Sequence, residues 1–247
     1  MKKYMTAFQM TQSMFCSLPF PCKKWEETCR PYMLLFLPVI GLEIGILWMA
    51  MSFLLKYMNV PTPIYGLFMC GLPYLATGFM HLDGFMDVSD AIGSYRDLEK
   101  RRAILKDYHV GAFAVVWSIF LILAGFTAFA SDRGNAPSWI LVLIPMLSRC
   151  CSALAVMKLK PMNTSQYAAS TSYPVGHSVV LGILILGSVA AGFVLGRKYG
   201  IILVAGLIGY GLPLRKGYKM LQGMNGDISG YCICISELCA VLAFVLL

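Results

Sequence analysis

Long apolar runs separated by short polar segments make up most of this chain. The runs lie at 32–55, 61–80, 110–130, 138–157, 177–196, 200–214 and 231–247. An α-helix needs about 20 apolar residues to cross a bilayer core, and the last two runs are short. The pattern therefore predicts an all-α, polytopic integral membrane protein with six or seven transmembrane helices.

The composition also favours a membrane protein and leaves little for a soluble domain. Hydrophobic residues make up 58% of the 247 residues and charged residues only 13%, whereas soluble domains carry about 25% charged residues. No segment of domain size is left once the apolar runs are removed. We therefore expect a single membrane-embedded domain over residues 1–247, in which Gly41 and Gly45 have a spacing that suits close helix packing.

The positive charges indicate which way the helices run. With seven spans, one side of the membrane holds only Lys56, Arg133, Arg197 and Lys198, and nearly all other Lys and Arg residues fall on the opposite side. The positive-inside rule then places the N-terminus and the loops 81–109, 158–176 and 215–230 in the cytoplasm. This topology and attraction to anionic membrane lipids account for the net charge of +8 without a nucleic-acid partner.

Three aspartates follow the second apolar run at a spacing typical of one helix face. Asp83, Asp87 and Asp90 lie in the segment H-L-D-G-F-M-D-V-S-D-A at 81–91, so on a helix they point the same way. A single aspartate at a helix end is often a cap, but one cap does not explain three. Such carboxylates repel one another, and oxygen ligands favour Mg²⁺ or Mn²⁺. The segment therefore predicts a metal site for phosphate chemistry at a membrane surface.

His81, the first residue of this segment, and Asp107 are further candidates for the chemistry. His81 either orients a metal ligand or transfers a proton, or it has only a capping or packing role. Asp107 is either part of the site, as a further metal ligand, or the partner of an adjacent basic side chain. Both alternatives stay open for each residue.

A basic segment at 95–107 is interpreted as an amphipathic helix at the membrane surface. Leu98 and Leu105 recur at helical spacing, with basic side chains between them. These bases contact either lipid phosphates or the pyrophosphate of a substrate. The substrate-binding candidates in this segment are Arg96, Arg101, Arg102 and Lys106.

A glycine-rich turn at 222–230 precedes the last apolar run. Asn225 and Gly226 stand beside Asp227, and such a turn lets the backbone approach an anionic ligand closely, although an ordinary flexible turn has the same composition. Arg149 and Glu237 lie inside apolar runs, where a charge is costly unless it is paired. Arg149 is therefore expected to bind either an acidic partner or a substrate phosphate.

Together these polar segments resemble the motifs of the cobalamin synthase family. The chain carries H-L-D-G-x-x-D-x-x-D-A at 81–91, R-D-x-E-x-R-x-x-I-L-K-D-x-x-x-G-A-F at 96–113 and G-x-x-G-D-x-x-G at 223–230. The sequences L-P-F-P at 18–21 and L-S-R at 147–149 are similar to further landmarks of that family. The chain departs from the family pattern after Pro161, where an Arg and a Gly are usual, and in the late turn, where G-G-x-T-G-D is usual.

The resemblance implies an adenosylcobinamide-GDP ribazoletransferase, an enzyme of late cobalamin biosynthesis in the prokaryotic cell membrane. Such an enzyme joins adenosylcobinamide-GDP to α-ribazole, or to α-ribazole 5′-phosphate, and releases GMP in a Mg²⁺-dependent reaction. The product is adenosylcobalamin or its 5′-phosphate. On this chain the resemblance implies a metal held by Asp83, Asp87 and Asp90, and a further ligand or general base at Asp227 or Asp107. Whether the chain forms a homo-oligomer stays open.

Two other classes of protein are the alternatives. A CDP-alcohol phosphotransferase-like lipid enzyme also has an aspartate-rich metal site, but its D-G-x-x-A-R pattern does not follow Asp83 here. An ion-coupled transporter would use the acids to couple ions, and such folds are typically built from paired half-repeats, which we do not find in the sequence. The transferase is therefore the preferred hypothesis.

Overall fold

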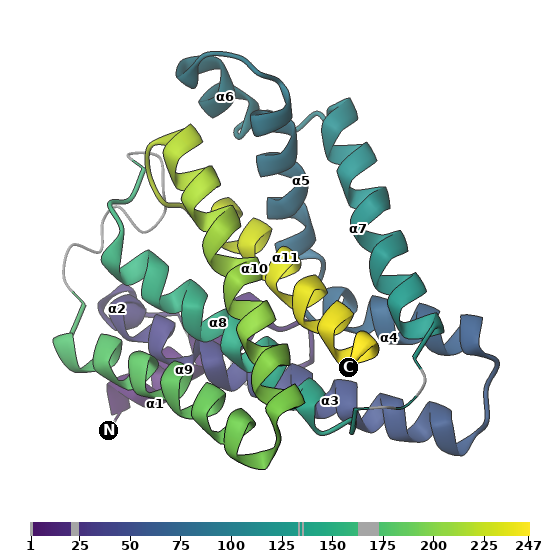
Figure 1. Ribbon diagram of the computed structural model, residues 1–247. Coiled ribbons are helices and arrows are strands. Elements are labelled where there is room, and N and C mark those ends of the chain that lie inside the picture. The colour runs from purple at the N-terminus through teal and green to yellow at the C-terminus, as the bar shows by residue number, and fades with distance from the viewer. Residues whose placement is uncertain (1, 21–24, 133, 135, 163–172) are drawn as a thin grey trace.

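The computed structural model describes residues 2–20, 25–132, 134, 136–162 and 173–247 as an assembly of helices (Figure 1). The described residues contain no β-strand, only an isolated bridge between Pro161 and Met224, so the predicted all-α class is confirmed. In chain order the elements are α1 (Lys2–Phe15), η1 (Glu27–Cys29), α2 (Arg30–Met33), η2 (Leu34–Phe36), α3 (Leu37–Tyr57), α4 (Thr62–Ala76), α5 (Met80–Gly93), α6 (Leu98–Ile104), α7 (Ala112–Ala130), α8 (Ile140–Lys158), α9 (Val175–Leu195), α10 (Arg197–Leu221) and α11 (Gly226–Leu246).

Five helical stretches are long and apolar enough to cross a membrane. They are the continuous stretch Glu27–Tyr57, α7, α8, α11 and most of α9. A sixth candidate is α4 together with α5, which are bent by 91° at the break between them. α10 has 25 residues, but basic residues near both of its ends leave only the short apolar middle that the sequence indicated. The structure therefore confirms a polytopic membrane protein with up to six candidate spans among its described helices.

The bend between α4 and α5 has a local backbone cause. Gly78 and Phe79 follow each other with φ angles of +57° and +62°, in the left-handed region that glycine adopts readily and phenylalanine rarely does. The Thr77 hydroxyl donates to the Pro73 carbonyl at 3.0 Å where α4 ends. The predicted run at 61–80 is therefore not one straight helix, and α5 begins in a new direction.

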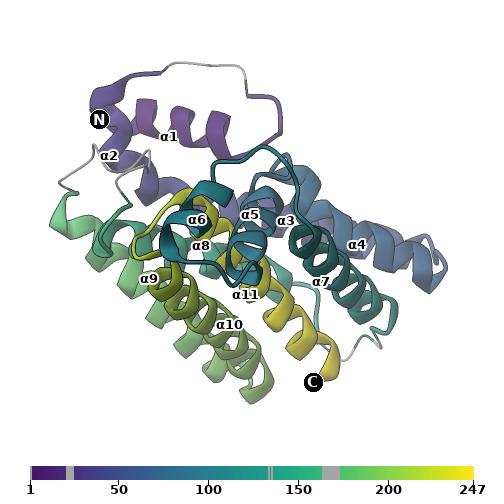
Figure 2. The same ribbon diagram turned by 90° about the horizontal axis from the view of Figure 1, so that it is seen from above.

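Glycines set the distances between several of the helices seen from above in Figure 2, as the space at their Cβ positions shows. A Cβ at Gly45 would lie 2.5 Å from the Val142 carbonyl oxygen, and a Cβ at Gly41 would collide with the Pro145 carbonyl. The close packing predicted for these two glycines is confirmed, because they bring α3 against α8. α11 in turn packs against both α10 and α5, which makes it the central helix beside α5.

The predicted surface helix at 95–107 is shorter in the structure. α6 covers only Leu98–Ile104, at the end of the molecule where α5 ends and α7 begins (Figure 1). Tyr95 has a φ of +53°, which is outside the helical region, and the Asp97 carboxylate accepts the Lys100 N–H at 2.9 Å as the cap of α6. The predicted helix therefore begins three residues late, because its first acidic residue serves as its cap.

Candidate active site

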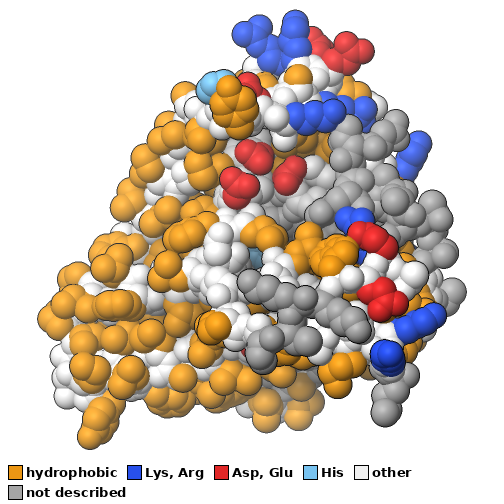
Figure 3. All heavy atoms as spheres, turned by 180° about the vertical axis from the view of Figure 1, so that it is seen from behind, with side chains coloured by type: hydrophobic (Ala, Val, Ile, Leu, Met, Phe, Trp, Pro, Cys, Tyr) orange, Lys and Arg blue, Asp and Glu red, His pale blue; other side chains and the backbone are white. Residues whose placement is uncertain are grey.

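Asp83, Asp87 and Asp90 lie along one face of α5, as their spacing predicts. All three are within the helix Met80–Gly93, whose N-cap residue is Phe79, a residue that makes no side-chain capping hydrogen bond. None of the three aspartates is therefore the N-cap of α5, so the simple capping alternative does not explain them. Acidic side chains gather in a hollow on this side of the molecule, with Lys and Arg side chains toward the end beyond it (Figure 3).

The three aspartates line one small pocket, which we name the aspartate pocket. Its volume is about 20 Å³, and its other walls come from the end of α6 and the start of α7. A cavity needs about 10–15 Å³ to hold one water molecule, so this pocket has room for one water-sized occupant. None of the ion pairs found among the described residues includes Asp83, Asp87, Asp90 or Asp227.

Gly111 allows α7 to begin directly beside Asp90. A Cβ at Gly111 would collide with both carboxylate oxygens of Asp90, so the aspartate occupies the space that a side chain would need. Gly111 is also the N-cap residue of α7, which carries the positive end of the helix dipole. The family-like G-A-F sequence at 111–113 therefore has a structural reason, since only glycine leaves room for this carboxylate.

A second pair of glycines brings Asp227 to α5. A Cβ at Gly84 would lie 2.9 Å from the Asp227 Cα, and a Cβ at Gly230 would lie 2.8 Å from the His81 carbonyl oxygen. The start of α11 therefore packs backbone to backbone against the start of α5, and Asp83 and Asp227 line one pocket. Residues 143 or more positions apart in the chain are joined in this way.

Asn225 shapes the beginning of α11. Its Oδ1 accepts the Ile228 N–H at 3.0 Å, and its Nδ2 donates to Asp227 Oδ2 at 2.5 Å. The turn before it is fixed to the end of α8, because Met162 N–H donates to the Met224 carbonyl and Met224 N–H to the Lys160 carbonyl. Asn225 thus caps α11 and orients Asp227, while Gly226 lines the pocket that Asp83 and Asp227 share.

This second pocket, which we name the His81 pocket, has a volume of about 110 Å³. It lies between α1, α5, α8 and α11, with Asp83 and Asp227 among its polar residues. His81 is only 8% exposed, and its Nε2 has no hydrogen-bond partner in the described part of the chain. His81 is not the N-cap residue of α5, which is Phe79, and its burial is compatible with the packing role.

Asp107 lies at the surface and is engaged by its own neighbour. The backbone N–H and the ring Nδ1 of His109 contact Asp107 Oδ1 at 3.0 and 2.7 Å, and they lower the pKa of the Asp107 carboxyl below its usual value. His109 itself lines the aspartate pocket, whereas Asp107 does not. His109 was not among the predicted site residues, because only the fold of the chain between α6 and α7 brings it to the aspartate pocket.

Two of the four predicted substrate-binding bases hold the end of another helix. Arg102 donates from Nε to the Leu221 carbonyl at 3.0 Å and from Nη2 to the Gln222 carbonyl at 2.8 Å. Arg101 donates to the Met220 carbonyl at 3.3 Å. They therefore fasten α6 to the C-terminal end of α10, while Arg96 and Lys106 are exposed. Substrate binding by the four residues stays a prediction.

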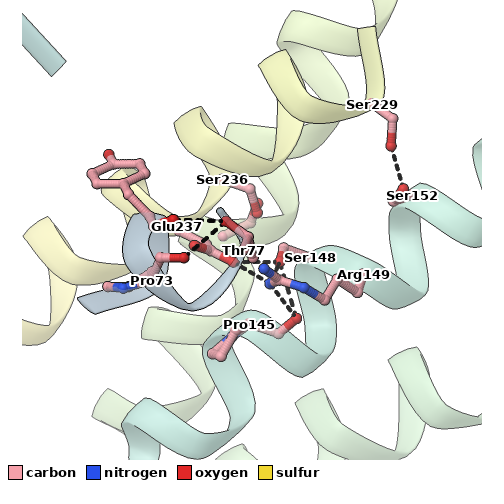
Figure 4. A network of polar contacts seen from close by, with 11 residues as sticks. Pro73, Thr77, Pro145, Ser148, Arg149, Ser152, Ser229, Ser236 and Glu237 are labelled. Carbon is pink, nitrogen blue, oxygen red and sulfur yellow. Dashed lines mark hydrogen bonds and ion pairs between the residues drawn. The ribbon is translucent and has the colours of Figure 1, made fainter. Parts of the chain in front are cut away.

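Arg149 is paired with Glu237 in the interior (Figure 4). Arg149 Nη1 lies 2.5 Å from Glu237 Oε1, and the Ser148 hydroxyl donates to the same oxygen at 2.9 Å. The side chains are 1% and 11% exposed. The predicted acidic partner of Arg149 is therefore found, and the pair joins α8 to α11; contact with a substrate phosphate stays a prediction.

The donor set fits a hard divalent cation in the type of its ligand atoms. Three carboxylates face one pocket of the right size, and oxygen ligands are what Mg²⁺ and Mn²⁺ prefer. In the conformation of the described residues, however, no three His, Cys, Asp or Glu side chains are close enough together to hold a metal ion. The carboxylates would therefore have to turn toward a bound ion. The chain departs from the family pattern in the segment 163–172, which lies outside the described residues.

Comparison with known proteins places the chain among enzymes of one kind. A family model described as "Cobalamin-5-phosphate synthase" matches residues 7–245. A protein of Clostridium perfringens named "Adenosylcobinamide-GDP ribazoletransferase" is 38% identical over 247 residues, 98% of each chain. Proteins of the same name from Clostridium botulinum and Lachnoclostridium phytofermentans are 31% and 29% identical, over 96% and 99% of this chain and 96% and 95% of their own. No solved structure matches.

Proposed function

The chain belongs to the cobalamin-5-phosphate synthase family, and on that premise we propose that it catalyses the adenosylcobinamide-GDP ribazoletransferase reaction. Its substrates are then adenosylcobinamide-GDP and α-ribazole or α-ribazole 5′-phosphate. A ribose oxygen forms a bond to the phosphorus on the cobinamide side of the pyrophosphate, and the bond from that phosphorus to the GMP oxygen breaks. The proton of the attacking hydroxyl goes to a carboxylate or to water, and GMP leaves.

The observation that carries this proposal is the match of nearly the whole chain to one family of enzymes. The position of the acidic residues supports it, because Asp83, Asp87 and Asp90 share a pocket at the end of the bundle. A lipid enzyme of the CDP-alcohol phosphotransferase type and a transporter are disfavoured, since the relatives along the full chain carry the transferase name.

We propose Asp83, Asp87 and Asp90 as the residues that hold Mg²⁺, with Mn²⁺ as a substitute. A cation bound there would neutralise the charge of the pyrophosphate and of the leaving GMP. Asp227 is placed beside Asp83 by the glycine contacts, and Asn225 fixes its orientation. Asp227 is therefore the better placed of the two proposed bases, because Asp107 is occupied by His109 at the surface.

The exposed bases are proposed to bind the donor substrate. Arg96 and Lys106 extend from either side of α6 and are free to contact phosphate oxygens or anionic lipid head groups. We further propose that the protein lies in a prokaryotic cell membrane with its N-terminus and active site in the cytoplasm, as the distribution of positive charge favours.

The proposal is tested by turnover of the purified protein in proteoliposomes. Adenosylcobinamide-GDP and α-ribazole are supplied with Mg²⁺ or with EDTA, and GMP and cobalamin are quantified. We expect equal amounts of both products with Mg²⁺ and neither with EDTA. A folded protein that forms no cobalamin with Mg²⁺ would contradict the proposed reaction, and turnover in EDTA would contradict the metal dependence.

A further inference from the structure

A large groove lies between α7 and α10, and we name it the α7–α10 groove. Its volume is about 450 Å³, and residues of α5 and α11 line it together with residues of the two flanking helices. In both Figure 1 and Figure 2, α5 and α11 lie between α7 and α10. α7 and α11 are candidate membrane spans, so this groove belongs to the part of the molecule that faces lipid.

One end of the groove is apolar and reaches the middle of two candidate spans. Leu121 and Ala124 line it near the middle of α7, and Ile235 and Leu238 line it near the middle of α11. Phe120 lines it as well and is 63% exposed, so the groove is open at the surface of α7. Apolar cavities stay free of water and bind hydrocarbon instead.

The other end of the groove is polar and positively charged. Tyr95 lines it just after the end of α5, and Lys216 lines it near the C-terminal end of α10. Arg215 and Lys219 are exposed beside Lys216 on the same helix. None of the ion pairs found in the described part of the chain includes these three basic residues. Their charge is therefore available to an anionic ligand, such as one that carries a phosphate.

Ser89 supplies a buried polar group that faces the groove. Its side chain is 6% exposed, and no hydrogen bond of its hydroxyl is found among the described residues. The oxygen is not one of the fully enclosed atoms without a partner, so it is open to the groove that the residue lines. Buried polar atoms are nearly always hydrogen-bonded in native proteins, and a ligand oxygen would satisfy this hydroxyl.

The volume of the groove fits one hydrocarbon chain. A cavity of roughly 150 Å³ binds benzene, and the groove with its volume of about 450 Å³ holds about three times as much hydrocarbon. This is close to one acyl chain of a phospholipid. Such a chain ends at an ester and a phosphate, so a chain at the apolar end of the groove brings these groups toward Ser89 and Lys216.

The groove and the aspartate pocket lie on opposite faces of α5. Phe85, Ser89 and Ile92 line the groove, and each follows one of the three aspartates of this helix by two residues. Two residues correspond to about 200° around an α-helix. A molecule in the groove is therefore separated by α5 from any group that reacts at the aspartates.

We propose that the α7–α10 groove is a binding site for one anionic phospholipid. One acyl chain lies along Leu121 and Leu238, the phosphate contacts Lys216, and the hydroxyl of Ser89 donates to an ester oxygen. The lipid thus supports α5 from the face opposite to the aspartates. This site is independent of the proposed reaction and would be present in the resting protein.

The charge contact is tested by native mass spectrometry of the purified protein in detergent. Phosphatidylglycerol and phosphatidylcholine with the same acyl chains are added at equal concentration. We expect wild-type protein to retain one lipid molecule and to prefer phosphatidylglycerol by about fivefold or more. Lys216→Gln should lose most of this preference, because it keeps the length of the side chain and removes its charge. Lys219→Gln is the matched control, since Lys219 is exposed on the same helix and does not line the groove.

The apolar part of the site is tested by filling it. Ala124→Phe and Ile235→Trp each place an aromatic ring in the groove, from α7 and from α11, and should lower the retention of both lipids by about fivefold or more. Ala191→Phe is the control, because Ala191 is exposed on α9 and lies outside the groove. Added phosphatidylglycerol should raise the melting temperature of wild-type protein and of Ala191→Phe, but not of the two filled variants.

The outcomes separate the lipid from other occupants. Wild-type protein that retains no lipid would overturn the site, and so would wild-type retention in folded Ala124→Phe and Ile235→Trp. Equal retention of both lipids by wild-type protein, or an unchanged preference in Lys216→Gln, would overturn the contact between Lys216 and the phosphate. Displacement of the retained lipid by α-ribazole would assign the groove to the aromatic acceptor instead.

Discussion

Asp83 is the residue at which the two pockets meet. It lines the aspartate pocket with Asp87 and Asp90, and the His81 pocket with Asp227. In the proposed reaction, a carboxylate in this position would hold the cation at the donor pyrophosphate and also lie beside the pocket that contains Asp227. The proposed roles therefore predict that the charge of Asp83 contributes more to catalysis than that of an exposed aspartate outside the pockets.

Asp83→Asn is expected to lower kcat by about a hundredfold or more, because the amide keeps the shape but removes the charge that acts on the transition state. The variant should still insert into the membrane and melt at nearly the wild-type temperature, since Asp83 forms no ion pair among those found in the described residues. The measurement is GMP release with saturating substrates and Mg²⁺.

Asp97→Asn is the matched control for this change. It alters an exposed carboxylate that caps α6, and asparagine is an equally good cap, so kcat should stay within about twofold. Wild-type turnover by Asp83→Asn would remove Asp83 from the catalytic residues.

The position of a single residue could be predicted from the sequence where it depends only on nearby residues of the chain. The spacing of Asp83, Asp87 and Asp90 is enough to place them on one helix face, and α5 confirms it. His109 could not be placed in the same way, because it reaches the aspartate pocket only through the fold of the chain between α6 and α7. The partners of Arg102 lie about 119 residues away in the chain, so its carbonyl contacts were equally invisible.

The close contact between α5 and the start of α7 depends on Gly111. Because a Cβ at this position would collide with the Asp90 carboxylate, Gly111→Ala should displace either the aspartate or the start of α7. We expect kcat to fall by about tenfold to a hundredfold, since small displacements of catalytic groups are costly. The concentration of Mg²⁺ that gives half-maximal turnover should rise as well.

Gly182→Ala serves as the control for this helix substitution. Gly182 lies in α9 with open space around its Cβ position, and alanine is the better helix former, so activity and stability should be retained. Wild-type activity and Mg²⁺ dependence in Gly111→Ala would show that Asp90 has no role that depends on its position.

A second contact between helices is the attachment of α6 to the end of α10 by Arg102. Arg102→Ala removes the two hydrogen bonds to the Leu221 and Gln222 carbonyls and should lower the free energy of unfolding by about 1–3 kcal/mol. Hydrogen exchange in residues 98–104 should become faster, because α6 has seven residues and no buried ones. Arg96→Ala changes an exposed arginine beside the same helix and should leave exchange unaltered.

The predicted boundaries of a helix were close to the observed ones where a change from apolar to polar residues ends the helix. They were wrong where the backbone conformation of one or two residues ends it. The apolar runs at 110–130 and 138–157 correspond closely to α7 and α8. The run at 61–80 instead breaks at Gly78 and Phe79, where a left-handed phenylalanine is unexpected from sequence. The length of the helix predicted at 95–107 was overestimated because Asp97 is the N-cap of α6. An aspartate among other charged residues does not show from sequence alone whether it lies within a helix or caps it.

At the scale of the whole molecule, α11 brings the two halves of the site together. Gly84 and Gly230 set its contact with α5, and the Arg149–Glu237 pair fixes it to α8. Removing one member of a buried pair leaves an uncompensated charge, so each of these two residues depends on the other inside its apolar run. Sequence spacing could suggest that Arg149 needs an acid, but not that the acid is on the helix that carries Asp227.

The orientation in the membrane is the remaining property of the whole molecule that can be tested directly. Met58 lies between α3 and α4 and is 60% exposed, and Lys106 is exposed next to α6. The distribution of Lys and Arg predicts that the first faces outward and the second faces the cytoplasm. In right-side-out vesicles, a membrane-impermeant maleimide should therefore label Met58→Cys at once and Lys106→Cys only after the membrane is permeabilised. Wild-type protein gives the background, since its described cysteines are buried or only partly exposed. The reverse labelling pattern would place the aspartates outside the cell, where neither GMP release nor an intracellular supply of adenosylcobinamide-GDP would make sense.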